Sequence, residues 1–201
     1  MSTIKLVTPT RFLGFDLIKE MNHAGSTTEY KPLNDQEKQV AVLPPRVMFD
    51  DRLVKQDNYV FDVFQSTIRF SEPLSLRIPY FEVVILEMDT VATVMIGCQR
   101  GITNMVDSDI NCYGSFGYES SGDLWTGAEI KSWGIPFGPG DVIGVGIDGT
   151  NTIVITFNGR ARRLTNWSPP TFATFIPCVQ VQRGYAKVFM NFGQLPFSYN
   201  L

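Results

Sequence analysis

Histidine is the scarcest of the residues that carry chemistry in this chain, and cysteine is nearly as scarce. His23 is the single histidine, and no G-x-S-x-G or comparable motif sets a nucleophile beside a base. This absence excludes the common serine and cysteine hydrolase mechanisms. Cys98, Cys112 and Cys178 lack C-x-x-C spacing, so neither a zinc cage nor a disulfide framework is predicted, and we expect buried thiols in a reducing compartment. The sequence therefore predicts no enzyme, no bound metal and no cofactor.

Positive charge is also in short supply. The chain has 17 lysines and arginines against 20 aspartates and glutamates, for a net charge of −3, and no Lys/Arg-rich stripe. Proteins that bind nucleic acid or anionic membranes need a basic surface, so neither partner is expected. No segment approaches the roughly 20 apolar residues that span a bilayer, and the N-terminus lacks the basic stretch and apolar run of a signal peptide. We expect a cytosolic location, with the nucleus as a second one.

The chain length suits one sizeable domain with an extension. We place an N-terminal extension and linker, packed on the domain, in residues 1–45, and the domain itself in residues 46–201. Apolar residues within 12–21 suit a short amphipathic helix or a docked strand, and the polar residues 22–39 suit a surface loop. From Val47 onward, short apolar runs separated by Gly, Pro, Asn and Asp recur about every ten residues. This spacing is typical of an all-β sandwich of two antiparallel sheets with little helix.

The clearest local signal lies between Gly138 and Arg160. In its first half, two sets of residues alternate. One set is large and apolar: Ile143, Val145 and Ile147. The other set has almost no side chains, because two of its three members are glycine: Val142, Gly144 and Gly146. This period of two predicts a strand with one face toward a core and another against which something packs closely. Asp148-Gly149 and Asn158-Gly159 supply residues that tolerate the positive φ of tight hairpin turns.

Several sequence blocks occur in a fixed order around this hairpin: Pro79–Ile85, Val94–Cys98, Ser115–Tyr118, Gly140–Gly144, Phe175–Val179 and Met190–Phe197. In this order they resemble a SPRY domain, over a region that runs from Ser66 to Phe197. The Gly-Tyr, Gly-Asp-Val-Ile-Gly and Asn-Phe-Gly-Gln blocks are most similar to SPRY domains of the Ran-binding-protein-M type. The resemblance implies a concanavalin-like jelly roll, a sandwich of two antiparallel sheets that acts in protein interaction.

A carbohydrate-binding function is the alternative, because the SPRY fold is similar in architecture to the legume-lectin sandwich. Lectin calcium sites need clustered Asp and Asn ligands, and one candidate set exists, although a solvated acidic loop is the simpler account of it: Asp107, Asp109 and Asn111. Asp141 and Asp148 could in principle take part in glycosidase chemistry. Both flank turns, where aspartate commonly caps backbone donors, and we interpret them as structural.

The interpretation that remains is a rigid sandwich that presents loops to a protein or peptide partner. Seven residues are candidates for partner binding: Arg69, Arg100, Tyr118, Trp125, Trp133, Arg183 and Tyr185. The segment around Arg69 resembles the arginine-bearing segment of SPRY subunits in histone-methyltransferase complexes, where that arginine belongs to a basic pocket for an acidic partner. Peptide-reading SPRY adaptors of ubiquitin ligases carry a Val-Trp pair where this chain has Gln182-Arg183, which argues against their asparagine-rich ligand.

We therefore predict a positive, partly apolar pocket in which Arg69 and Arg183, both expected on loops, converge beside Trp133. The expected partner is a protein or peptide, acidic in character, and the module itself is expected to be a monomer. Purely structural roles remain as alternatives for two groups of residues. Trp125 and Trp133 could cap the edge of the sandwich, and the arginines of residues 160–163 could form a solvated strand edge that discourages aggregation.

Overall fold

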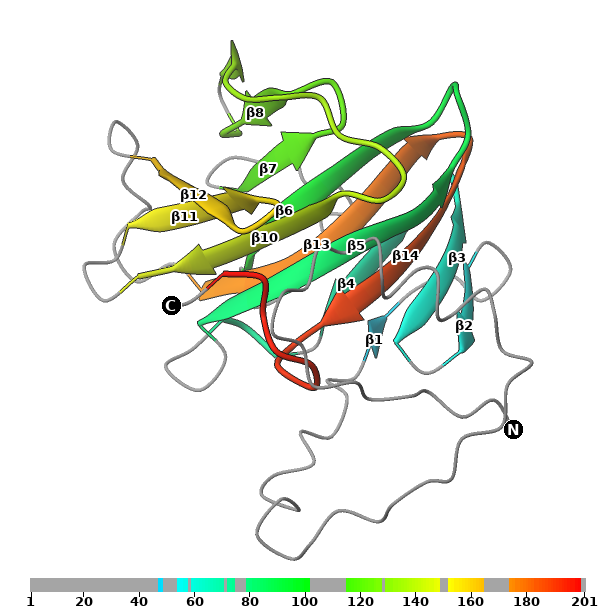
Figure 1. The fold of residues 1–201 in the computed structure, drawn as a ribbon, viewed down its shortest axis with the longest axis horizontal. Helices are drawn as coiled ribbons and strands as arrows, with labels where there is room; N and C mark the ends of the chain where they lie inside the picture. The colour runs from blue at the N-terminus through cyan, green and yellow to red at the C-terminus, as the bar shows by residue number, and fades with distance from the viewer. Residues whose placement is uncertain are drawn as a thin grey trace, which may run out of the picture.

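The computed structural model describes residues 47–48, 54–57, 59–70, 72–74, 79–101, 115–127, 129–148, 152–164 and 174–199. Within these ranges the chain forms fourteen β-strands and no helix, arranged in two seven-stranded antiparallel sheets (Figure 1). The all-β sandwich prediction is confirmed. The described ranges thus contain no helix that is long and apolar enough to cross a membrane. The predicted extension of residues 1–45 with His23, the acidic set of residues 107–111 and Cys112 lie outside the described residues.

The first sheet, here called sheet A, has seven strands. Its order is β1 (Val47–Met48), β4 (Thr67–Phe70), β13 (Thr174–Arg183), β6 (Thr93–Gly101), β7 (Phe116–Glu119), β8 (Asp123–Trp125) and β9 (Ile130–Ser132). The long strands β13 and β6 form its centre, and the register between them shifts at Val181 and Arg183. Neighbours in this sheet come from distant parts of the sequence, so its surface brings together residues that the chain keeps far apart.

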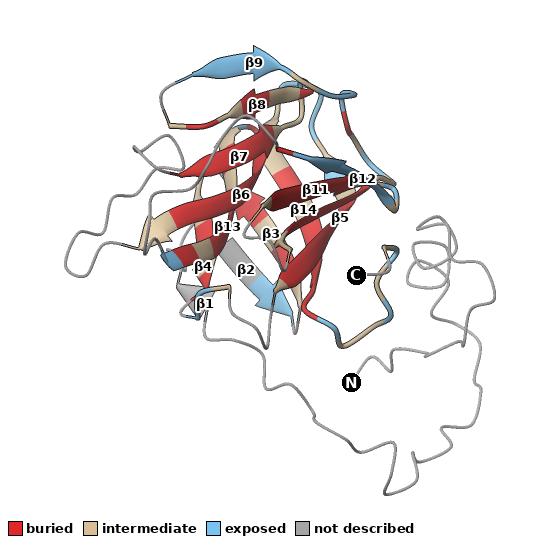
Figure 2. Cartoon of the chain, turned by 90° about the vertical axis from the view of Figure 1, so that its left-hand side faces the viewer, coloured by how far each residue is buried: buried red, intermediate tan, exposed pale blue. Residues whose placement is uncertain are grey.

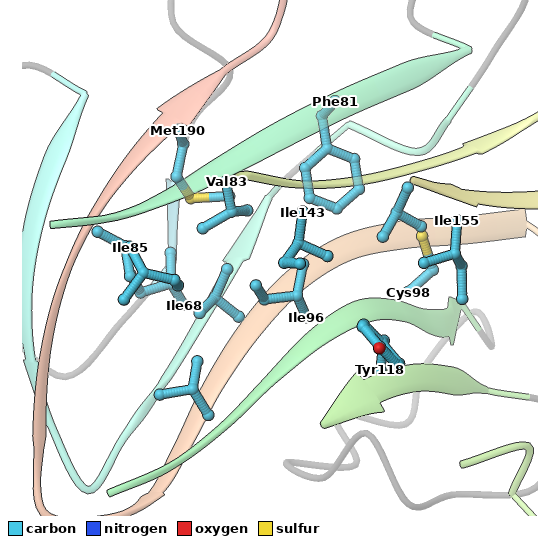
Figure 3. Close-up of a cluster of buried hydrophobic side chains, with 14 of the residues drawn as sticks. Ile68, Phe81, Val83, Ile85, Ile96, Cys98, Tyr118, Ile143, Ile155 and Met190 are labelled. Atoms are coloured by element: carbon cyan, nitrogen blue, oxygen red, sulfur yellow. The ribbon is translucent and has the colours of Figure 1, made fainter. Parts of the chain in front are cut away.

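The second sheet, sheet B, faces sheet A across the core. Its order is β12 (Arg160–Arg163), β11 (Ile153–Phe157), β10 (Val142–Ile147), β5 (Tyr80–Met88), β14 (Tyr185–Asn191), β3 (Val60–Phe64) and β2 (Val54–Asp57). Apolar side chains from both sheets meet between them (Figure 3), among them Ile68 and Ile96 of sheet A with Phe81 and Ile143 of sheet B, all with 0% of their surface exposed. Each such side chain stabilises the fold by about 1.5 to 3 kcal/mol.

The strand predicted from the alternating pattern is β10. Its apolar set faces the core as expected, with Ile143 and Val145 fully buried. Its bare face accommodates the ring of Tyr80 from the neighbouring strand β5, because a Cβ atom at Gly144 would lie 1.8 Å from the Tyr80 hydroxyl oxygen. The close packing predicted for these glycines is confirmed. Asn158 and Gly159, with φ of 47° and 76°, form the tight turn between β11 and β12.

The structure also confirms that Asp141 and Asp148 cap turns and that Cys98 and Cys178 are buried, as the sequence predicts. The backbone N–H of Gly138 donates to a carboxylate oxygen of Asp141 at 2.9 Å, and that of Thr152 donates to Asp148 at 3.0 Å. Both aspartates therefore cap turns. Cys98 and Cys178 form no disulfide and are fully buried, and burial raises the pKa of the Cys98 thiol well above its ordinary value.

Candidate functional site

One row of residues crosses the outer face of sheet A, the face turned away from the core. In β4, Ile68 and Phe70 are buried in the core, so Arg69 between them points outward. Successive pairing partners on five strands make up this outer row: Arg69, Cys178, Gly97, Gly117 and Trp125. Directly paired residues share one face of a sheet. The row therefore runs from a guanidinium to an indole, with two glycines between them.

The glycines explain how Trp125 reaches the middle of the sheet. A Cβ atom at Gly97 would lie 2.5 Å from the Cα of Gly117, so this position admits no side chain. Trp125 packs against a cluster of two fully buried residues, Met95 and Cys178. Met95 lies on β6, two strands away from β8, which is about 10 Å at the usual strand spacing. The indole spans this distance over the bare backbone of the glycines.

Three buried polar atoms on this face have no hydrogen-bond partner in the described part of the chain: Arg69 Nε, Trp125 Nε1 and Gln180 Oε1. Gln180 lies two residues from Cys178 on β13, on the same outer face, and pairs with Met95. A buried polar group without a partner costs about 1 to 3 kcal/mol. We call the five residues around these atoms the outer-face site: Arg69, Met95, Trp125, Cys178 and Gln180.

The outer-face site offers two donors, one acceptor and an apolar floor. Arg69 Nε and Trp125 Nε1 are donors only, and Gln180 Oε1 is an acceptor. A peptide group supplies both complements, a carbonyl oxygen that accepts and an N–H that donates. The Arg69 guanidinium adds a preference for a carboxylate, which it binds through charge-assisted hydrogen bonds. The polar atoms of the outer-face site are therefore complementary to those of a peptide backbone.

The prediction that Arg69 lies on a loop is wrong, because Arg69 is the third residue of strand β4 and pairs with Cys178. The sequence itself carries the reason. Ile68 and Phe70 flank it at a period of two, so the local pattern is that of a strand with one outward position. A side chain on a paired strand is held more firmly than one on a loop, which suits a binding residue.

Trp133 and Tyr118 belong to another part of the molecule. Tyr118 points into the core with 2% of its surface exposed, and its hydroxyl donates to the carbonyl of Ile135. Burial raises the pKa of this tyrosine. The Trp133 ring meets Tyr118 edge to face at 5.8 Å, and the Arg162 guanidinium lies 4.4 Å above the indole. Trp133 thus covers an edge of the core, as the alternative interpretation holds.

The other three predicted residues are dispersed. Arg183 lies five positions beyond Cys178 along β13, about 17 Å away at the usual rise per residue. The pocket predicted from Arg69, Arg183 and Trp133 is therefore not formed. Arg100 pairs with the core residue Phe175, so it lies toward the inner face at the end of β6. Of the seven predicted residues, the structure brings only Arg69 and Trp125 to the outer-face site.

Tyr185, at the start of β14 in sheet B, bonds to residues on or next to the two strands that flank β14, β3 and β5. Its hydroxyl donates to a carboxylate oxygen of Asp62, and its backbone N–H donates to Asp89 at 3.0 Å. Burial and the hydrogen bond to Asp62 raise the pKa of Tyr185. All these partners lie within sheet B and its connections, so the structure places this residue in a local polar cluster.

Sequence reasoning missed a polar cluster on the outer face of sheet B. The Glu82 carboxylate is 3% exposed and accepts hydrogen bonds from the Tyr80 hydroxyl at 2.9 Å, from Ser198 N–H at 2.9 Å and from Tyr199 N–H at 3.3 Å. The segment of residues 192–199 therefore lies across sheet B and satisfies the buried charge. A glutamate within an apolar strand pattern was the signal for this cluster. Burial, followed by the charge of Glu82, raises the pKa of Tyr80.

In the described ranges, no group of three or more His, Cys, Asp or Glu side chains could hold a metal ion. The acidic set considered for calcium in the sequence lies outside those ranges.

Comparisons with known proteins place the chain in a family. The model of the SPRY domain family matches residues 78–195. A solved human SPRY domain is 21% identical, with a TM-score of 0.58 over 74% of this chain and 99% of that chain. The SPRY domain of human HERC1 is 15% identical, with a TM-score of 0.57 over 74% of this chain and all of that chain. A search of curated proteins gave no match. Because the family model spans more than half of its residues, this chain belongs to the SPRY domain family.

Proposed function

We propose that this chain is a non-catalytic module that binds a short peptide or a protein surface through the outer-face site. SPRY domains are protein-interaction modules, generally without catalytic activity. The observation that carries the proposal is the group of three unpartnered buried polar atoms on one sheet face. A partner that supplied their hydrogen bonds would recover the stability that the free chain loses, at about 1 to 3 kcal/mol for each group.

The chemistry of the site favours an acidic segment. The chain is negative overall, with a net charge of −3, so Arg69 is a local exception that steers a carboxylate to one end of the outer row. The half-buried Trp125 indole, which packs on the buried side chains of Met95 and Cys178, gives an aliphatic or aromatic residue a surface to contact. The partner is thus an acidic peptide with an apolar anchor. We also propose that the chain is a monomer and that its SPRY domain is of the Ran-binding-protein-M type.

We further propose a cytosolic location, with the nucleus as a second one, which the fully buried free thiols Cys98 and Cys178 support. Imaging of the tagged full chain in cells tests this, and a signal confined to the secretory pathway would contradict it.

The test of the binding function is an affinity pull-down with the wild-type chain, followed by Kd measurements with the captured partner. Arg69→Gln should weaken binding by about 1 to 3 kcal/mol, which is roughly 5- to 150-fold, because it removes a charge-assisted hydrogen bond. Trp125→Phe, which retains a ring but loses the Nε1 donor, should weaken binding by a smaller factor. Lys187→Gln on sheet B is the matched control and should retain wild-type affinity. Equal losses in the control and in the outer-face variants would place the binding site elsewhere.

A further inference from the structure

Strand β12 is the edge of sheet B, and it carries an unusual concentration of charge. Its four residues, Arg160 to Arg163, include three arginines, and all four are exposed (Figure 2). Within the described residues β12 pairs only with β11. The strand thus combines an open backbone edge with a basic surface, on a chain whose net charge is −3.

Within the described ranges, half of the backbone groups of β12 pair with no other strand. Hydrogen-bonded and non-hydrogen-bonded pairs alternate along an antiparallel ladder. Leu164 N–H donates to the carbonyl of Ile153 at 3.0 Å, which fixes the alternation for the pairs that precede it. Arg160 and Arg162 accordingly bond to β11, whereas the N–H and C=O groups of Ala161 and Arg163 point away from the sheet. An extended peptide can pair with these groups as an added strand.

The arginine side chains divide between the two faces of the strand. Arg160 and Arg162 are paired with Phe157 and Ile155, which pack in the core, so both guanidiniums lie on the side facing sheet A. Arg162 stacks on the Trp133 indole there. Arg163, on the opposite face, bonds to the carboxylate of Asp148 at 3.1 Å. Two guanidiniums at alternate positions thus share one face.

An exposed apolar residue lies close in the chain to Trp133, the ring on which Arg162 stacks. Ile135, two residues beyond Trp133, has 63% of its surface exposed, and its backbone is fixed by the hydrogen bond from Tyr118. Exposed apolar surface next to charge is typical of a protein-binding surface.

We propose that β12 is a docking strand for a partner segment that adds to sheet B in extended conformation and carries carboxylates at alternate positions. The inference goes beyond the proposed function, because β12 belongs to the other sheet. A second copy of this chain is a poor occupant, since its β12 would set arginine against arginine. A nucleic acid would engage the charge but not the open backbone edge. An acidic peptide matches both features.

The test uses a ten-residue peptide of alternating glutamate and threonine, measured on the full chain by fluorescence anisotropy. Binding should weaken as salt increases. The double variant Arg160→Gln/Arg162→Gln should lower affinity at least tenfold, and Lys187→Gln should not change it. On the wild-type protein, the same peptide with serine for glutamate, and one N-methylated at alternate backbone nitrogens, should each bind at least tenfold more weakly. In NMR spectra, the amides of Ala161 and Arg163 should shift on binding.

Four results would overturn the proposal, and three of them need no variant. If the N-methylated peptide bound as tightly as the unmodified one, the attraction would be due to charge alone. If the serine peptide bound as tightly as the glutamate peptide, the carboxylates would not be recognised. Wild-type affinity in the double arginine variant, with its strand content verified by circular dichroism, would place the peptide elsewhere. A single-stranded oligonucleotide that competes as well as the peptide would point to a polyanion site instead. The double arginine variant changes β12 of sheet B and leaves the outer-face site on sheet A intact, so each proposal can fail by itself.

Discussion

Replacing Gln180 by methionine should make the isolated protein more stable and its partner binding weaker. Gln180 Oε1 is buried without a partner, and in the described part of the chain its side chain makes no hydrogen bond that the change would remove. Methionine has nearly the same shape and would pack on Met95, its pairing partner on β6. Removing a buried unsatisfied acceptor should stabilise the fold by about 1 to 2 kcal/mol. For a domain of this size, Tm should rise by about 2 to 8 °C.

Thermal unfolding followed by circular dichroism measures the first half of this prediction without knowledge of any partner. Gln182→Met on the same strand is the matched control, because Gln182 is half-buried like Gln180 but, among the described residues, has no buried polar atom without a partner, so Tm should change by less than about 2 °C. Affinity for the captured partner should fall about 3- to 10-fold in the Gln180 variant, the value of one hydrogen bond. A lower Tm in Gln180→Met than in the control would refute the reasoning that this acceptor is unsatisfied in the free protein.

Three further predictions concern the scaffold. Gly97→Ala should destabilise the protein by about 3 kcal/mol or more, seen in urea unfolding, because the new Cβ would lie 2.1 Å from the carbonyl oxygen of Phe116. Glu82→Gln should cost about 1 to 3 kcal/mol and speed limited proteolysis near Ser198 and Tyr199, whose N–H groups Glu82 anchors; unchanged cleavage would contradict this anchoring. Because the pKa of Cys98 is raised on folding, its contribution to stability is complete below its ordinary value of 9.0 and is lost as pH increases above it. Cys98→Ala should therefore flatten the alkaline loss of stability.

Local features were predictable from the sequence because they depend on neighbouring residues. The period of two in Val142–Ile147 predicts which residues of β10 face the core, and Asn158-Gly159 predicts the turn, since both depend on backbone geometry within a few residues. The outer-face site depends on register between strands far apart in the chain. Arg69 and Trp125 meet on one row only because β13, β6 and β7 lie between their strands in that alignment. A one-residue slip in any of these pairings would move one of them to the core face.

The two outer faces of the sandwich differ in whether the described residues supply hydrogen-bond partners for their buried polar groups. This difference supports the proposal that the partner binds on sheet A. On sheet B, residues 192–199 of the chain itself supply the N–H groups that the Glu82 carboxylate needs, so the fold completes that face. On sheet A, no described residue supplies the partners of Arg69 Nε, Trp125 Nε1 and Gln180 Oε1. A buried charge or dipole is tolerated when it is paired and is costly when it is not. The face whose polar groups the described residues leave unpaired is the one where, in our proposal, a second molecule gains most by binding.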